Sequence, residues 1–491
     1  MSANTSTSQH ATRLSKRTLF AGLLAFFGAA CGNDSSVAPK ITAPELLISA
    51  NLSAFAGEEF SRVIVVNDAQ GLPVTVTVDG LPAWLAFIPG QRLLRGTPSV
   101  RDAGTIRTIR IAATNGTHTV MRETDIRVFG SAKEKQLQEQ LETLFMANTG
   151  SMRGVSIAVV DASGQSYAAF MGRMGSSPTH PRIERIHKYR LASVTKPMTT
   201  ALILKLIEEG KLGLDDIITS RYSTALPNAN SITVRHLLTH TGGVFDHLNA
   251  NVFWSSPQQS QTKVWTVPEI VQFAVNHGPL FTPGTSYAYS NTGFVVLGAL
   301  IETVTGLSLA DAFSQMLISP LGLSDILYDD FSTMSNPIQT LVFNSRSYEY
   351  HATAAGASGA MVGSPTEVAR FGWHVYGGRY VTAALTNLMS INHGSQVGGQ
   401  NYGLGTRIWT VAGIRHHGHT GNLMNYRNIL MYVPEADISI AMHTHDPHTG
   451  WNQLIDAMLA YVVTNFSDRP VKRLPFVMYA DEVRELDNTI D

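Results

Sequence analysis

Residues 191–197 read Leu191-Ala-Ser-Val-Thr-Lys-Pro197 and place a serine and a lysine three positions apart. In a helix, residues three apart share a face, so the Oγ of Ser193 and the Nζ of Lys196 can meet. Pro197 is tolerated only in the first turn of a helix, where its missing N–H is not needed. The segment therefore predicts a helix over residues 194–209 that is closed by Gly210, with Ser193 at its positive N-terminal end.

The chemistry of this pair requires an activated serine. A serine hydroxyl is a weak nucleophile until a base takes its proton. A lysine can be that base when burial or a nearby cation lowers its pKa. A single Ser-x-x-Lys match arises easily by chance in 491 residues, and the alternative is a capping serine beside a solvated lysine. The interpretation therefore depends on further motifs.

A second motif, Tyr289-Ser-Asn291, lies in a turn-rich segment over residues 283–293. A tyrosine near a lysine can exist partly as phenolate and pass a proton onward. The amide of Asn291 can bind a substrate carbonyl. The alternative is a core tyrosine and a turn asparagine. Tyr287 is an alternative to Tyr289 for the proton-transfer role, but it is not followed by Ser-Asn as Tyr289 is.

A third motif, His419-Thr420-Gly421, precedes a predicted strand hairpin over residues 427–443. Backbone N–H groups on such a strand can supply an oxyanion hole. The same triplet begins at His240, in a predicted loop after a helix, and at His448, before the last predicted helix. Order along the chain and the neighbouring hairpin favour His419, whose alternative is a loop histidine without a role.

In this order the three motifs resemble those of the serine β-lactamase-related family. That family includes class C β-lactamases, D-Ala-D-Ala carboxypeptidases and related esterases. The resemblance covers roughly residues 135–466 and includes further blocks, at Gly210–Asp216, Val234–Gly243, Asn291–Gly298, Gly356–Gly359 and Ser364–Glu367. It implies an acyl-enzyme mechanism on ester, amide or β-lactam carbonyls, with a small molecule or peptide as substrate and no cofactor.

The resemblance also implies a role for each position. Ser193 would be acylated, while Lys196 and Tyr289 would share the general-base and general-acid work. Asn291 would orient the substrate. The oxyanion hole would consist of the backbone N–H groups of Ser193 and Asn422. The remaining substrate-binding positions would be those of the third motif, namely His419, Thr420 and Gly421.

The third motif departs from the family pattern. Many relatives carry glycine where this chain has Asn422, and Asn425 occupies a further glycine-like position. Asparagine tolerates the left-handed region, so the loop can be kept while the pocket is altered. His419 stands where relatives often have a permanently charged lysine, and an ordinary imidazole pKa is near ~6.5. We therefore expect weak recognition of substrate carboxylates, with recovery as the pH falls through the pKa of His419.

Other functions have less support in the sequence. Residues 443–448 (His-Thr-His-Asp-Pro-His) include several residue types that often bind metals, but their spacing differs by one residue from the metallo-hydrolase pattern. We therefore predict no metal site. No Gly-x-Ser-x-Gly occurs, which disfavours an α/β-hydrolase. A catalytically silent penicillin-binding or surface-binding protein remains the alternative. The net charge of -1 gives no support for nucleic-acid binding.

The N-terminus predicts export. Arg13, Lys16 and Arg17 precede an apolar run over residues 19–30, which is short for a membrane span but fits a signal peptide. The run ends in small residues before Cys31, the single cysteine, and this pattern resembles a bacterial lipobox. We expect a lipid anchor on Cys31 that holds the protein at a membrane, facing the periplasm or the exterior; the alternative is a plain signal cut near Ala30.

Beyond the signal peptide of residues 1–31, we predict a tether (32–41), an Ig-like β-sandwich (42–130), a catalytic domain (132–466) and a charged tail (467–491). Strand patterns occur over residues 155–160, 167–170, 406–414, 427–433 and 438–443, around a helical middle. This arrangement predicts an α+β fold, with an antiparallel sheet of the β-lactamase/transpeptidase type and a helical domain. The Ig-like module is expected to be a spacer, or else a carbohydrate- or surface-binding module that contacts the cell wall.

Overall fold

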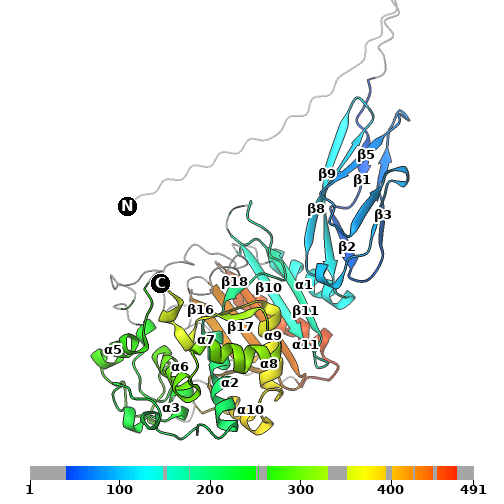
Figure 1. The fold of residues 1–491 in the computed structure, drawn as a ribbon. Coiled ribbons are helices and arrows are strands. Elements are labelled where there is room, and N and C mark those ends of the chain that lie inside the picture. Colours follow the sequence, from blue (N-terminus) through cyan, green and yellow to red (C-terminus); the bar gives the residue numbers. More distant parts are fainter. Residues whose placement is uncertain are drawn as a thin grey trace, which may run out of the picture.

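The computed structural model describes residues 40–147, 152–175, 177, 179–249, 253, 263–329, 351–393, 401–423, 426–445 and 450–472. Cys31, the predicted signal peptide and almost the whole predicted tether lie outside these residues, as does the tail beyond residue 472. The described residues form an elongated β module that stands on one end of a larger α+β domain (Figure 1).

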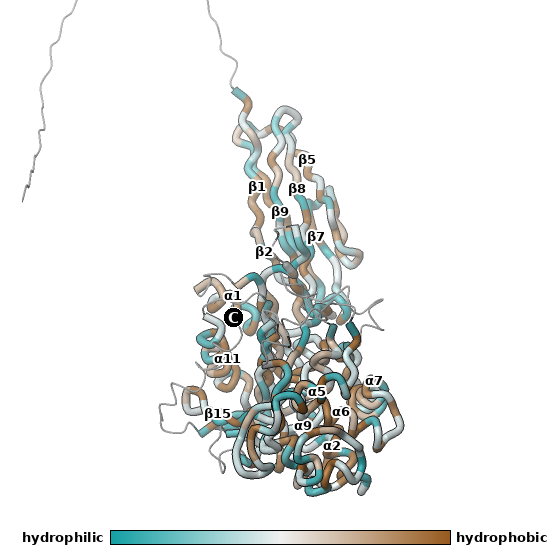
Figure 2. Tube along the Cα trace, turned by 90° about the vertical axis from the view of Figure 1, so that its left-hand side faces the viewer, coloured by the Kyte–Doolittle hydropathy of each residue, from teal (hydrophilic) through white to brown (hydrophobic). Residues whose placement is uncertain are grey.

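The module is an Ig-like sandwich of short strands, as the sequence predicts. One sheet has the order β2-β9-β8-β5, a second has the order β3-β7-β6, and β1 pairs with β4. Ile109, Ile111 and Ala113 on β8 are buried while the residues between them are more exposed, and this period of two gives the strand one core face. Figure 2 shows the same alternation of hydropathy along the strands. The bounds are β1 Glu45–Leu47, β2 Asn51–Phe55, β3 Phe60–Val63, β4 Val65–Asn67, β5 Thr75–Asp79, β6 Leu85–Ile88, β7 Leu93–Gly96, β8 Ile106–Thr114 and β9 Thr119–Phe129.

The larger domain, which the sequence predicts to be catalytic, is built on a six-stranded antiparallel sheet with the order β11-β10-β18-β17-β16-β15. Two strands come from the start of the domain and four from its end, which confirms the predicted α+β fold. The predicted strand over 406–414 is in fact two strands, because Ala412 and Gly413 both have positive φ and form the tight turn of a hairpin. The bounds are β10 Gly154–Val160, β11 Ser166–Gly172, β15 Arg407–Val411, β16 Ile414–Leu423, β17 Tyr426–Val433 and β18 Ile438–His445.

Helices cover both faces of this sheet. Val155, Ile157 and Val159 of β10 pack in one cluster with α1 (Ala132–Ala147) and α11 (Trp451–Phe466). Ala158 and Val160 point the other way, into the cluster that holds α9 (Pro365–Tyr376). A strand that is covered on both faces is apolar along most of its length, and Ser156 is the one polar residue of β10. Each fully buried aliphatic side chain contributes roughly 1.5–3 kcal/mol.

The helical middle lies beside the sheet and carries two of the three motifs. The central helix α2 (Thr195–Glu208) packs against α6 (Asn291–Thr305), whose N-cap is Ser290. The predicted bounds of α2 were off by one residue at each end, and Gly210 has the positive φ expected of a closing glycine. The other elements of this part are α3 Val234–Leu238, α5 Val267–His277, α7 Leu309–Ala312, α8 Ser319–Leu321, α10 Ala383–Met389 and the small sheet of β12 Tyr189–Arg190, β13 Ile326–Tyr328 and β14 Met361–Gly363.

Among the described residues, no single helix has the length and apolar character of a membrane span; only α6 with residues 309–321 passes that test, as a pair bent by 79°.

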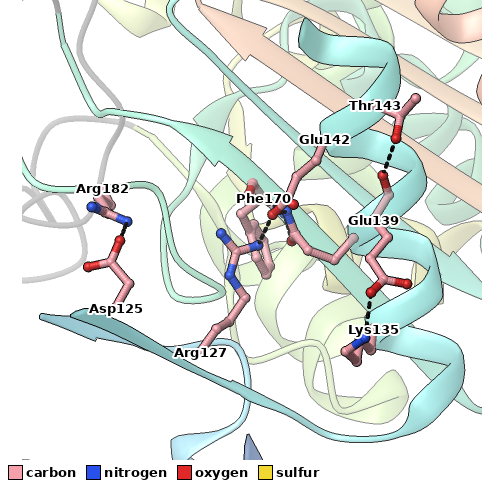
Figure 3. A network of polar contacts seen from close by, with 9 residues as sticks. Asp125, Arg127, Lys135, Glu139, Glu142, Thr143, Phe170 and Arg182 are labelled. Carbon is pink, nitrogen blue, oxygen red and sulfur yellow. Dashed lines mark hydrogen bonds and ion pairs between the residues drawn. The ribbon is translucent and has the colours of Figure 1, made fainter. Parts of the chain in front are cut away.

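The module and the catalytic domain meet through charged residues (Figure 3). Arg127 on β9 pairs with Glu142 on α1 at 3.1 Å, and Asp125 on β9 pairs with Arg182. Arg107 on β8 pairs with Glu184 at 2.8 Å. Arg182 and Glu184 belong to the segment between β11 and β12, which leads into the first motif. The module is therefore attached beside the chain segment that precedes Ser193.

Candidate active site

The candidate nucleophile lies in a strained turn at the start of α2. Ser193 is the middle residue of a 3₁₀ turn, Ala192–Val194, and Ala192 has a φ of +50°, which a non-glycine residue rarely adopts. The N–H of Thr195 donates to the carbonyl of Ala192. Because the peptide unit is planar and trans, the N–H of Ser193 points the opposite way, out of the helix. This direction is the one that an oxyanion-hole donor needs.

Two predicted partners converge on the hydroxyl of Ser193. The Nζ of Lys196 lies 3.1 Å from the Oγ of Ser193, and the hydroxyl of Tyr289 donates to the same oxygen at 2.9 Å. The Nζ also lies 4.7 Å from the centre of the Tyr289 ring. The structure therefore brings the first two motifs together, although 96 residues separate Ser193 from Tyr289.

Lys196 is held in an environment that favours its neutral form. Its side chain is 0% exposed, and burial, with help from the nearby charge of Arg407, lowers its pKa well below the ordinary value, against the opposing effect of Asp246. Its Nζ also donates to Oδ1 of Asn291 at 2.6 Å and to the carbonyl of Ser358 at 3.0 Å. A neutral amine fixed in this way has a lone pair that can take the proton of Ser193.

Asp246 completes this arrangement, and the sequence reading missed it. Its carboxylate accepts from the backbone N–H of Asn291 at 3.1 Å and from the Nδ2 of the same residue at 3.0 Å. These bonds turn the amide oxygen of Asn291 toward Lys196. Asn291 is therefore occupied as a link between Lys196 and Asp246, in addition to its predicted role toward the substrate. Asp246 lies three residues after the family-like block that ends at Gly243. This position was the sequence feature that could have indicated a role for Asp246.

Tyr289 is a neutral phenol in this site. Burial raises its pKa well above the ordinary range, while Arg407 and the bond to Ser193 act in the opposite direction. The expectation of a partial phenolate is therefore wrong for the resting protein, because the desolvation of an anion outweighs the nearby charge of Arg407. Tyr287, the competing tyrosine, is half-buried and is not among the partners of Ser193.

His419 lies on β16 rather than in a loop, and it is 0% exposed. Its Nε2 pairs with the hydroxyl of Tyr402 at 2.9 Å, and its Nδ1 pairs with the carbonyl of Thr420 at 2.6 Å. Burial and the charges of Arg407 and Lys196 lower its pKa well below the ordinary value. The expected gain of charge near the ordinary histidine pKa is therefore wrong, because burial beside the guanidinium of Arg407 keeps the imidazole neutral.

The rest of the third motif follows on the same strand, with Thr420 half-buried and Gly421 and Asn422 beside it. Gly421 is required by packing, since a Cβ at this position would lie 2.1 Å from the carbonyl oxygen of Leu191. The strand therefore contacts the turn that carries Ser193. Asn425 lies outside the described residues.

Other histidines do not form a second centre in the described part of the chain. His443 and His445 alternate along β18 with Thr444 between them, and all three are buried. The described residues contain no group of three or more His, Cys, Asp or Glu side chains that could hold a metal ion. Asp446 and His448 lie outside them. His240, of the rejected triplet, is packed 4.2 Å from the Tyr289 ring as a buried neighbour.

The family comparison agrees with the fold and with the arrangement of the three motifs. The Beta-lactamase family model matches residues 132–464. The chain belongs to this family. A second model, described as "Putative Ig domain", matches residues 41–128.

Individual relatives cover parts of the chain. Penicillin-binding protein 4* of Bacillus subtilis (strain 168) is 31% identical over 197 residues, which are 39% of this chain and 41% of that protein. Esterase EstB of Burkholderia gladioli is 31% identical over 153 residues, which are 28% of this chain and 37% of that protein. The chain thus spans about two fifths of the length of these relatives.

Solved structures agree in fold. The D-amino acid amidase of Ochrobactrum anthropi SV3 aligns with a TM-score of 0.58 at 23% identity, covering 68% of this chain and 99% of that chain. The octameric penicillin-binding protein homologue of Pyrococcus abyssi aligns with a TM-score of 0.56 at 23% identity, covering 70% of this chain and 79% of that chain.

Proposed function

We propose that this chain is a serine hydrolase that acts through an acyl-enzyme on Ser193. The observation that carries the proposal is the convergence of Lys196 at 3.1 Å and Tyr289 at 2.9 Å on one hydroxyl oxygen. A nucleophile within hydrogen-bond reach of a base, which is itself oriented by further groups, is the arrangement that covalent catalysis requires.

In the proposed reaction, neutral Lys196 takes the proton of Ser193 as its Oγ forms a bond to the substrate carbonyl carbon. The developing oxyanion is held by the backbone N–H groups of Ser193 and Asn422. The bond from that carbon to the leaving group then breaks, and the leaving group takes the proton of Tyr289. Lys196 returns its proton to Tyr289, and attack by water with the same groups releases the acid.

The test is covalent labelling. A fluorophosphonate probe and a slow ester substrate should each add mass to the wild-type protein, and Ser193→Ala should show no adduct and no turnover. Adduct formation on the Ser193→Ala variant would remove Ser193 from the mechanism. Failure of folded wild-type protein to react with either reagent, with fluorescent penicillin still bound, would favour the catalytically silent binding protein.

The preferred substrate is proposed to be an ester or amide without a carboxylate near the scissile bond. His419 offers no exposed charge at the position where many relatives have lysine, and it stays neutral because its pKa is lowered. The absence of a buried charge-assisted hydrogen bond to a substrate carboxylate costs up to ~2 kcal/mol, about thirtyfold in rate. Arg407, which is 7% exposed and lies 5.7 Å from the Tyr289 ring centre, is the nearby permanent cation.

Two esters with the same leaving group test this preference. The kcat/KM of p-nitrophenyl butyrate should exceed that of p-nitrophenyl hemisuccinate, and their ratio should not change between pH 6 and 8. A ratio that falls toward pH 6 would show that His419 gains charge and binds the carboxylate. If the two esters react at equal rates with the wild type and at unequal rates with Arg407→Gln, Arg407 would be identified as a carboxylate-binding residue. That result would overturn the proposed preference.

A further inference from the structure

A row of buried polar side chains crosses the catalytic sheet beside the nucleophile turn. In the strand register, Gly421 of β16 faces Asn428 of β17, Asn428 faces His443 of β18, and His443 faces Ser156 of β10. The side chains of Asn428, His443 and Ser156 are each at most 1% exposed. A polar group in such an interior is tolerated only when its hydrogen bonds are made.

The carboxamide of Asn428 makes three bonds in this row. Its Nδ2 donates to the carbonyl of Arg190 at 2.9 Å and to the carbonyl of Gly421 at 3.2 Å. Its Oδ1 lies 2.8 Å from the Nδ1 of His443. An amide oxygen only accepts, so this Nδ1 carries the proton. Burial lowers the pKa of His443 to about 3, which keeps the ring neutral and this bond in place at ordinary pH.

The two carbonyls belong to the two segments that provide the oxyanion hole. The carbonyl of Gly421 and the N–H of Asn422 are part of one planar peptide unit, so fixing the carbonyl also fixes the direction of the N–H. Arg190 ends the strand β12, three residues before Ser193. One amide group therefore connects the strand of the third motif to the segment that leads into the nucleophile.

We propose that Asn428, held by His443, is a positioning residue that sets the distance and direction between the two oxyanion-hole N–H groups. This inference rests on the proposed serine mechanism, and it adds a residue that none of the three motifs contains. Asn428 does not touch the substrate; it acts through the peptide of Gly421 and through Arg190. A misplacement of about 1 Å at a reacting centre can cost on the order of 100-fold in rate.

The test replaces Asn428 by Leu, which has a similar size and no donor. A matched control is Thr444→Val on β18, which also loses one buried bond to a carbonyl, that of Gly154 at 2.6 Å, away from the site. For each variant, we would measure thermal unfolding, the acylation rate with p-nitrophenyl butyrate, and the inhibition constant of phenylboronic acid. The tetrahedral adduct of the boronic acid on Ser193 places an oxygen in the oxyanion hole.

We expect Asn428→Leu to lower the acylation rate by about 10- to 100-fold and to weaken boronic acid binding by a similar factor, with KM changed less than about threefold. Thr444→Val should lose stability without either change. If Asn428→Leu does not fold, His443→Phe keeps a ring but removes the donor to Oδ1, and it should shift both quantities in the same direction.

Wild-type acylation and boronic acid binding in a folded Asn428→Leu or His443→Phe variant would overturn the inference. So would equal losses in the Asn428→Leu and Thr444→Val variants. The Ser193→Ala variant separates this failure from that of the proposed function: if it is inactive while Asn428→Leu is normal, only the positioning role is wrong.

Discussion

The charge of Asp246 should set the pH range in which Lys196 works. One amide, that of Asn291, separates the two groups, with bonds of 2.6 Å to Lys196 and 3.0 Å to Asp246. These bonds place the charges about 7 Å apart, where the interaction is about 2 kcal/mol at an effective dielectric constant of 20. That energy corresponds to roughly 1.5 pKa units.

The direction of the effect follows from the form of Lys196 that reacts. In the proposed mechanism neutral Lys196 is the base, so kcat/KM should rise as the pH rises through its lowered pKa. The negative charge of Asp246 raises that pKa, and Asp246→Asn should therefore move the acidic limb of the profile to lower pH by up to about 1.5 units. Burial raises the pKa of Asp246 itself to about 6, so the full shift appears only where Asp246 is ionised in the wild type.

The assay is kcat/KM for p-nitrophenyl butyrate from pH 4.5 to 9 in the wild type, Asp246→Asn and the control Asp161→Asn. Asp161 is also a buried carboxylate with several hydrogen bonds, but it belongs to the β10–β11 turn. The control should lose stability and keep its acidic limb. An unchanged limb in Asp246→Asn, or a limb that moves to higher pH, would refute the coupling between Asp246 and the base.

Three further predictions address other parts of the chain. Gly421→Ala should lower acylation by at least about tenfold, because its Cβ would lie 2.1 Å from the carbonyl of Leu191; a rate within twofold of wild type would contradict this close packing. We propose that the protein is exported and lipidated, so Cys31→Ser should release it from membranes in cell fractionation, and unchanged membrane association would refute the anchor. Arg182→Ala should destabilise the protein by at most about 1 kcal/mol in thermal unfolding, because the Arg182 side chain is 37% exposed and solvent screens its ion pair with Asp125; a larger loss would mean that this contact holds more than one ion pair.

The sequence predicted those features that local patterns encode. The Ser-x-x-Lys pair, the proline in the first turn and the closing glycine fixed α2 to within one residue at each end. Short runs of strand-type residues predicted the strands of the larger sheet, with the exception of the turn at Ala412-Gly413. Such features depend on neighbours in the chain, and the family resemblance added the pairing of motifs far apart.

What the sequence could not show is the environment of each site residue. His419 and Tyr289 were given roles that assumed ordinary access to water, and their burial changed the expected charge of both. Asp246 and Asn428 escaped notice because an isolated acid or amide carries no spacing signal. Their importance comes from contacts with Asn291 and with the carbonyl of Gly421, which exist only after the strands and helices have packed.

In the proposed mechanism, the charges buried around the site favour the lysine, rather than a histidine, as the base. The guanidinium of Arg407 is buried beside the site, and burial, with nearby positive charge, lowers the pKa values of His240 and His419 well below the ordinary value. Asp246 is the acid that compensates positive charge at Lys196, and its own raised pKa weakens that compensation toward acidic pH. A protonated Lys196 would be a second buried cation beside Arg407 and would therefore be unfavourable in free energy. Loss of the proton from Lys196 removes this unfavourable interaction. In this arrangement, the activation of Ser193 follows from the balance of buried charge as much as from the three hydrogen bonds to the amine.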